Sequence, residues 1–248
     1  TGAGLINDLS KLKVSGTGRI SVAGALDESF TITEGALISL KSLTANGSGN
    51  IAINNVYNAN LATVLGVTTI AGTGSVAITG ATAENLTISS ALLASEPVGS
   101  VTAASNQSIT LSDAAAASLA TDTAKLHVSG TGKINILGAT GQSLSFTEAA
   151  LATFGTVAAT GGGNVTITDV TAAKFATDLA AVSVVTGTIN MLLASGQALT
   201  VAHAQLTGPV SITAASGDSI WLTAATGSTL ASDLSKLHVS GGGAIDVT

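Results

Sequence analysis

A stretch of fourteen residues recurs along this chain of 248 residues. It reads KLKVSGTGRISVAG at 11–24 and KLHVSGTGKINILG at 125–138, and a shortened form, KLHVSGGGAIDV, occupies 236–247. Self-similarity at a fixed spacing is the signature of repeat architectures, in which each unit buries its apolar face against the next unit. This repetition limits the possible folds more than any other feature of the sequence.

A shorter pattern underlies the long one: two aliphatic residues, separated by one residue, follow a Gly-rich turn. It occurs nine times, and the steps between its first members alternate between about 31 and about 25 residues. These first members are Ile20, Ile51, Val76, Ile109, Ile134, Val165, Ile189, Ile220 and Ile245. The regular alternation of long and short steps predicts paired coils, each pair spanning about 56 residues.

Each coil contains the same segments in the same order. A strand runs into the Gly-rich turn, and a second strand follows at once. Long coils then carry a third strand with an Ala/Leu stretch, as at 144–154, whereas short coils carry a short helical turn, as at 172–180. Aliphatic residues alternate with polar ones, which places Ile134 and Ile136 inside, and Lys133 and Asn135 outside.

These features predict an all-β fold: a parallel β-solenoid (a triangular β-helix) of about nine coils averaging about 28 residues. The coils alternate between long and short, with short helical turns in the short ones, and residues 1–248 form one continuous segment. A Greek-key β-sandwich is the alternative fold. It is less favoured because a sandwich does not require alternating step lengths.

Composition excludes several classes of function. Charged residues make up 9% of the chain, against about 25% in typical domains, and aromatic residues make up 2%. The net charge of −6 comes without a basic cluster, so no nucleic-acid partner is expected. Polar residues interrupt every apolar run well short of a membrane-spanning length, so no membrane insertion is expected. The absence of Cys rules out disulfides and thiolate metal sites.

The pattern V-S-G-T-G-x-I-x-V, with segments such as LSFTEAAL, resembles the β-strand-repeat regions of large secreted bacterial surface proteins, such as giant adhesins and S-layer-like proteins. The resemblance covers essentially the whole chain. It implies export, a place outside the cell or on the bacterial surface, and a structural or adhesive role.

Acidic residues that could bind calcium recur at one place in the short coils. Asp8, Asp122, Asp178 and Asp233 share this place, and Val64 occupies it in the remaining copy. Carboxylates two coils apart would be separated by about 10 Å, too far to share one ion. We therefore expect each Asp to cap or solvate its own turn, and we expect no metal site and no cofactor.

Zinc is not expected either. His127 and His238 replace Lys13 at an outward strand position, and four coils separate them. His203 stands at the position that Glu148 has in another long coil. We expect all three histidines to be ordinary surface residues.

Catalysis is not expected. Polysaccharide-cleaving β-helices need clustered acids and several sugar-stacking aromatic residues, whereas the outward positions here are mostly small and neutral, and no Ser/His/Asp arrangement can be assembled. Trp221 is the one candidate for glycan contact. Ice binding would need a regular ladder of threonines, and the Thr-x-Thr pairs are scattered.

The sequence thus predicts a structural component of an extracellular bacterial filament, surface layer or giant adhesin. The alternative is a carbohydrate-binding or carbohydrate-cleaving β-helix. Neither end of the sequence shows an amphipathic capping helix, so we expect further repeats or head-to-tail stacking of copies to cover the ends. Self-association and cell-surface glycans are the expected interactions.

Overall fold

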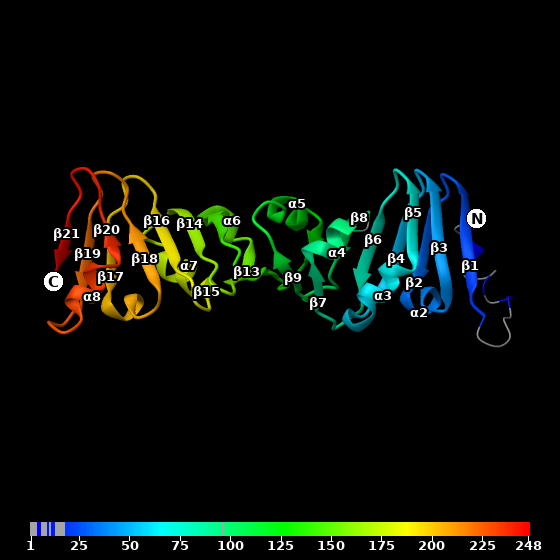
Figure 1. Ribbon diagram of the computed structural model, residues 1–248, viewed down its shortest axis with the longest axis horizontal. Helices are drawn as coiled ribbons and strands as arrows, with labels where there is room; N and C mark the ends of the chain where they lie inside the picture. Colours follow the sequence, from blue (N-terminus) through cyan, green and yellow to red (C-terminus); the bar gives the residue numbers. More distant parts are fainter. Residues whose placement is uncertain (1–3, 6–8, 10, 13–17, 96) are drawn as a thin grey trace. The chain divides into compact units, whose positions relative to one another are not determined.

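The structure is a computed structural model that describes residues 4, 5, 9, 11, 12, 18–95 and 97–248. The chain divides into two compact units (Figure 1). The first holds Thr1–Ser112 and Ser118–Ile134, and the second holds Asp113–Ala117 and Asn135–Thr248. Whether the chain is one continuous segment of a single architecture stays a prediction.

The first unit consists of short strands joined by tight turns or short helices. Its strands are β1 (Ile20–Leu26), β2 (Phe30–Thr33), β3 (Leu40–Gly47), β4 (Ile51–Val56), β5 (Thr68–Gly72), β6 (Val76–Gly80), β7 (Leu86–Ser89), β8 (Val98–Thr102), β9 (Ile109–Ala114) and β10 (Leu126–His127). Its helices are α2 (Glu34–Leu37), η2 (Asn58–Asn60), α3 (Leu61–Gly66), α4 (Ser90–Ser95) and α5 (Leu119–Ala124).

The second unit is built in the same way. Its strands are β11 (Ile134–Gly138), β12 (Leu144–Thr147), β13 (Phe154–Ala159), β14 (Val165–Val170), β15 (Val182–Val184), β16 (Ile189–Leu193), β17 (Leu199–Ala202), β18 (Val210–Thr213), β19 (Ile220–Thr223), β20 (Leu237–His238) and β21 (Ile245–Val247). Its helices are α6 (Glu148–Leu151), α7 (Phe175–Ala181), η3 (His203–Leu206) and α8 (Leu230–Leu234).

The strands form parallel sheets in which each strand pairs with the second strand along the chain. In the first unit the sheets are β1-β3-β5, β2-β4-β6-β8-β10 and the pair β7-β9. In the second unit they are β11-β13-β15, β12-β14-β16-β18-β20 and β17-β19-β21. The protein is thus mostly β with parallel sheets, as the sequence predicts.

The core is made of the aliphatic residues that alternate along the strands. In β4, Ile51 and Ile53 are fully buried, whereas Ala52 between them is partly exposed. The predicted inward register in β11 is confirmed at Ile136, which is 1% exposed, although Ile134 is only half-buried. Period-two alternation therefore identifies the core face of most strands correctly.

The short steps of the sequence repeat stack as expected. Ile51 lies opposite Val76, one short step further along the chain, and Ile220 lies opposite Ile245. In both cases the backbone N–H of the first residue donates to the carbonyl just before the second: Ile51 to Ser75 at 3.0 Å. These neighbours form continuous aliphatic ladders between adjacent strands.

The long steps do not stack as expected. Val76 lies opposite Val98 instead of Ile109, and Ile109 lies opposite Leu86. The extra strand in each long step, here β7, takes the pairing position, because its aliphatic residues match those of the following second strand. This corrects the expected three-sided long coil, in which a strand would pair with the third strand along.

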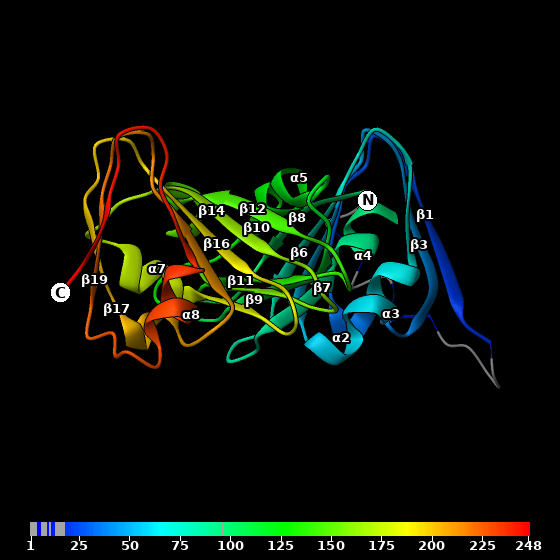
Figure 2. The ribbon, with the colours of Figure 1, turned by 60° about the vertical axis from the view of Figure 1, so that its left-hand side comes forward.

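The extra strand makes the number of strands in each repeat of about 56 residues odd, because five strands, such as β2 to β6, fill one repeat. Each sheet contains every second strand along the chain. With five strands in a repeat, equivalent helices therefore follow the strands of a given sheet in one repeat and precede them in the next. In the first unit, α2 and α3 follow the ends of β2 and β4, whereas α4 and α5 precede the starts of β8 and β10 in the same sheet. Figures 1 and 2 show α2 and α3 on the opposite side of this unit from α5.

Side chains just before the strands connect neighbouring strands. Asn50 Oδ1 accepts from Ser75 N at 2.7 Å, and Asn50 N donates to Ser29 Oγ at 2.9 Å. The second unit repeats the arrangement, where Asn164 Oδ1 accepts from Thr188 N at 2.7 Å. Backbone donors at the turns thereby find acceptors that the strands themselves do not supply.

The G-x-G turns are needed for close backbone approach. A Cβ on Gly72 would lie 2.0 Å from the carbonyl oxygen of Gly47, and one on Gly74 would lie 1.9 Å from that of Gly49. Such distances are impossible for real side chains, so only glycine lets successive turns lie directly on one another.

Engineered cysteine pairs test the strand order. Thr31 lies opposite Ala52 on adjacent strands, and partner strands are about 4.8 Å apart, within the reach of a disulfide. Since the natural chain has no Cys, Thr31→Cys with Ala52→Cys should form the only cross-link, detected by mass spectrometry of unreduced peptides. Stacking of the long step would instead cross-link Ser21→Cys with Ala52→Cys, and that outcome would contradict the observed order.

Candidate functional site

The buried polar side chains gather where the helices lie. Apart from Thr68, the buried polar and charged residues are Glu34, Ser90, Asp122, Glu148, Asp178 and Asp233. Each of these six lies at the start of a helix that follows an extra strand, or within the helix of the next turn of chain. In the second unit Glu148 of the first group lies beside Asp178 of the second, and Asp233 of the second group meets His203, which starts the helix after another extra strand. These two pairs are the most distinctive polar feature of the described residues.

Glu34 connects α2 to the turn that opens α3. Its Oε2 accepts from Tyr57 N at 2.5 Å, and its Oε1 accepts from Asn60 Nδ2 at 2.6 Å. Asn60 is the residue that precedes α3, so the carboxylate supplies acceptors at the start of that helix from the preceding turn of the chain. Val64 occupies the Asp position here and is fully buried.

Glu148 does the same for α7 in the second unit. Its Oε2 accepts from Thr171 N at 2.7 Å and from Thr171 Oγ1 at 2.9 Å, while Lys174 Nζ lies 3.5 Å from Oε1. Burial raises the pKa of Glu148, but these hydrogen bonds and the Lys174 ammonium outweigh it and hold the pKa below its usual value. Glu148 is therefore an anion at neutral pH.

His203 forms a different pair. Its Nδ1 lies 2.8 Å from Asp233 Oδ2 and 3.0 Å from Oδ1, and the Asp233 side chain is almost completely buried. The expectation that all three histidines are surface residues is thus wrong for His203, which is half-buried and paired. It is correct for His127 and His238, which are exposed on β10 and β20.

The recurring Asp residues are buried, which corrects the expectation that each caps or solvates its own turn. Asp122, Asp178 and Asp233 are at most 4% exposed, and Asp8 lies outside the described residues. Ser90 Oγ, Asp122 Oδ2 and Asp178 Oδ2 are buried without a hydrogen-bond partner. Within the described part of the chain, no group of three or more His, Cys, Asp or Glu side chains could hold a metal ion.

Both members of each pair were visible in the sequence as separate columns of residues. Their connection was missed because the partners, for example Glu148 and Asp178, are far apart along the chain. The number of residues between Glu148 and Asp178 is close to the long step of the repeat, and this match was the signal that the two positions could lie side by side. Two strands, β13 and β14, lie between them, so the helix after the extra strand lies next to the helix of the following turn.

The lysines of the KLHV motif also bind a helix. Lys125 Nζ donates to the carbonyl of Leu93 in α4 at 3.0 Å. Lys236 Nζ donates to the carbonyl of Leu206, at the end of η3, and to that of Gly208 at 3.0 Å. A cation at the last carbonyls of a helix complements both their lone pairs and the helix dipole. The recurring lysine is therefore part of the structure.

Trp221 lies on the outer face of β19, where sequence analysis placed it. Its side chain is 36% exposed, and its neighbours on the adjacent strands are Thr200 of β17 and Asp246 of β21. An indole beside a carboxylate and a hydroxyl can stack on a sugar ring, while its polar neighbours exchange hydrogen bonds with the hydroxyls at the rim. These three residues form the candidate glycan contact.

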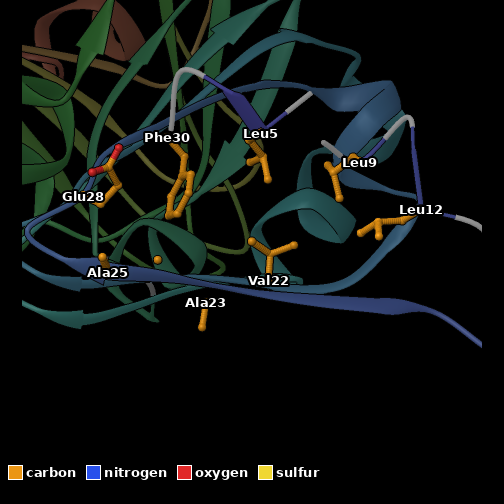
Figure 3. Close-up of a pocket in the computed structure, with 9 residues that line it drawn as sticks. Leu5, Leu9, Leu12, Val22, Ala23, Ala25, Glu28 and Phe30 are labelled. Carbon is orange, nitrogen blue, oxygen red and sulfur yellow. The ribbon is translucent and has the colours of Figure 1, made fainter. Parts of the chain in front are cut away.

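The hollows of the described surface are mainly apolar. One of about 260 Å³ lies between β1 and the leucines before it; Leu5 and Phe30 line one part of it, Leu9 and Leu12 another, and Glu28 lies at its margin (Figure 3). Another, of about 420 Å³, is an open hollow between α7 and the segment from η3 to β18. Neither brings together a nucleophile, a base and an acid.

Comparisons with known proteins yield no relative. No family model matches the chain, and no curated protein or solved structure is significantly similar to it. Among the described residues, no helix has both the length and the apolar character needed to cross a membrane.

Removing the Glu34 carboxylate tests the connection between the helices. In Glu34→Gln, an amide N–H₂ would face donors on Tyr57 and Asn60, so we expect unfolding free energy to fall by about 1–3 kcal/mol. Chemical denaturation measures this loss. The control Asp246→Asn removes an exposed carboxylate and should change stability by less than about 0.5 kcal/mol. Equal effects of the two substitutions would contradict the role of Glu34.

Proposed function

We propose that this chain forms a parallel β-solenoid rod and serves as a structural segment of an extracellular bacterial filament, surface layer or giant adhesin. The observation that carries the proposal is the strand order: each strand pairs in parallel with the second strand along. Such an arrangement grows by adding strands without changing its core, because each turn of chain contacts only its neighbours. The resemblance to secreted surface repeats supplies the extracellular location.

The coils of this solenoid are shorter than the sequence repeat. Phe30 pairs with Ile51, and Ile51 pairs in turn with Val76, so the chain returns to the same sheet twice within one repeat. We propose that one coil consists of two strands, a turn and a helical or turn edge. One repeat of about 56 residues then makes two and a half coils.

Stiffness is the mechanical property that such a rod would provide. Aliphatic ladders run continuously from strand to strand, and polar side chains such as Asn50 and Asn164 connect the turns beside them. Bending would have to break both sets of contacts together. This suits a spacer or scaffold that holds other parts away from the cell surface.

Axial association is the interaction that fits the exposed strand edge. β21 is the outermost strand of its sheet and pairs only with β19. Thr248 N donates to Leu222 O of β19. In a parallel pair only the N–H groups of alternate residues point at the partner strand. The N–H groups of Ile245 and Val247 therefore point away from β19. Such an edge can accept another strand, either from further repeats or from a second copy.

Electron microscopy and sedimentation of the 248-residue chain test the proposal. We expect concentration-dependent axial particles, which Val247→Pro should suppress, because proline removes an outward N–H of β21 and spares its bonds to β19. Val247→Ala is the matched control and should still associate. A wild-type chain that stays monomeric at high concentration, with the edge of β21 protected from hydrogen exchange, would exclude axial association.

Glycan binding is the second candidate function, favoured by the exposed position of Trp221 between Thr200 and Asp246. On a glycan array, a bound sugar should be lost with Trp221→Ala and retained with Leu137→Ala, which removes another exposed apolar side chain. Binding that both variants lose, or that both retain, would argue against Trp221 as the platform.

A further inference from the structure

Two buried carboxyl groups lie together in the second unit. Glu148 is the first residue of α6, and Asp178 lies in the middle of α7. Their exposed fractions are 7% and 4%. The Glu148 carboxylate contacts Lys174 at the start of α7, and Asp178 lies one helical turn after Lys174, to whose carbonyl its N–H donates at 2.9 Å. The two carboxyl groups are therefore neighbours. Two like charges this close and this buried repel strongly unless one of them is neutralised.

The partners of Glu148 hold that residue in its charged form. Both Thr171 donors and the Lys174 ammonium point at its carboxylate. Lys174 is half-exposed and supplies one positive charge against two carboxyl groups. One negative charge of the pair is thus compensated and the other is not.

Asp178 has the uncompensated oxygen. Its Oδ2 is buried and meets no hydrogen-bond donor. A carboxylate can only accept hydrogen bonds, but a protonated carboxyl group has an O–H that donates. With a proton bound, Asp178 can donate to the neighbouring Glu148 carboxylate, and the charge repulsion disappears.

We propose that Glu148 and Asp178 form a proton-binding site, in which the folded protein takes up one proton that both carboxyl groups share and so fastens α7 to α6 in mildly acidic surroundings. This property is independent of the proposed rod and of any ligand. The shared proton joins the middle of α7 to the first residue of α6.

Electrostatics agree with this geometry. Burial, followed by the charge of Glu148 and its hydrogen bond, raises the pKa of Asp178 to about 6, against the opposing effect of Lys174. The strands that pack on α7, β13 and β15, carry no titratable side chain. Asp169 of β14 is exposed and bonded to Thr168.

The direction of the pH dependence follows from the raised pKa. A carboxyl group whose pKa is about 6 when folded and 3.8 when unfolded contributes stability that is complete below 3.8 and is lost as the pH rises through 6. Glu148 acts in the opposite direction, but only as the pH falls below its ordinary value of 4.5. Stability should therefore increase when the pH is lowered from 8 to 5.

The other repeats provide matched controls. In the first unit, the fully buried Val64 occupies the position of Asp178 in the repeat, so Glu34 has no second acid at the matching position. Elsewhere in the second unit, Asp233 meets the imidazole of His203 instead of a second carboxyl group. Within the described part of the chain the acid pair occurs in one repeat, and Val64→Asp should create a second one.

Carboxyl-carbon NMR titration of the folded full chain tests the proposal directly. We expect the Asp178 signal to titrate near pH 6. The thermal midpoint should rise by at least about 3 °C from pH 8 to pH 5. Asp178→Asn should abolish most of this rise, whereas Asp122→Asn should retain it. Val64→Asp should enlarge the rise.

Two results would overturn the proposal. One is an Asp178 titration close to the ordinary value of 3.8 in the folded chain. The other is an unchanged pH dependence of the thermal midpoint in Asp178→Asn. If Asp178→Asn does not fold, the wild-type titration still decides the matter, because it needs no variant.

Discussion

Parallel pairing between each strand and the second strand along is the constraint on which the structure depends. Every pairing closes a short turn of chain, as from Phe30 to Ile51, and within it the chain must form two strands and two edges. So short a turn leaves room only for tight glycine turns or for helices of three to seven residues. The composition follows: small residues where backbones approach closely, aliphatic residues inside, and few charges.

Backbone polarity at the edges sets the second requirement. At each edge the chain leaves a strand, and N–H groups that the ladder would have paired need other acceptors. At the turns, Ser and Asn side chains such as Asn50 provide them. At the helices, Glu34 and Glu148 provide them from the preceding turn of chain. Glu34 and Glu148 are thus buried where they accept backbone hydrogen bonds, whereas Asp178 has an oxygen for which no donor remains.

Much of this fold follows from the sequence, and the exceptions have one cause. Alternation within strands predicts the buried face, as at Ile51 and Ile136, because the side-chain period of a strand is fixed. Alternation does not say which strand lies alongside. Val76 could match Ile109 or Val98 equally well by residue type, and only closure of the shorter turn decides for Val98. The same uncertainty concealed the pairing of Glu148 with Asp178, since both stand on short helices and are charged, which usually indicates solvent exposure.

The odd number of strands in a repeat has a consequence for how such a chain can change its length. Gaining or losing one repeat of about 56 residues would move every later helix to the opposite edge of its sheet. Gaining or losing two repeats would leave all edges unchanged. The three KLxV motifs begin at Lys11, Lys125 and Lys236, so two repeats separate each motif from the next. Duplication of two repeats at a time therefore keeps every helix on its original edge of the sheet. The KLxV motif, which returns once in every two repeats, has the spacing that such duplication would produce.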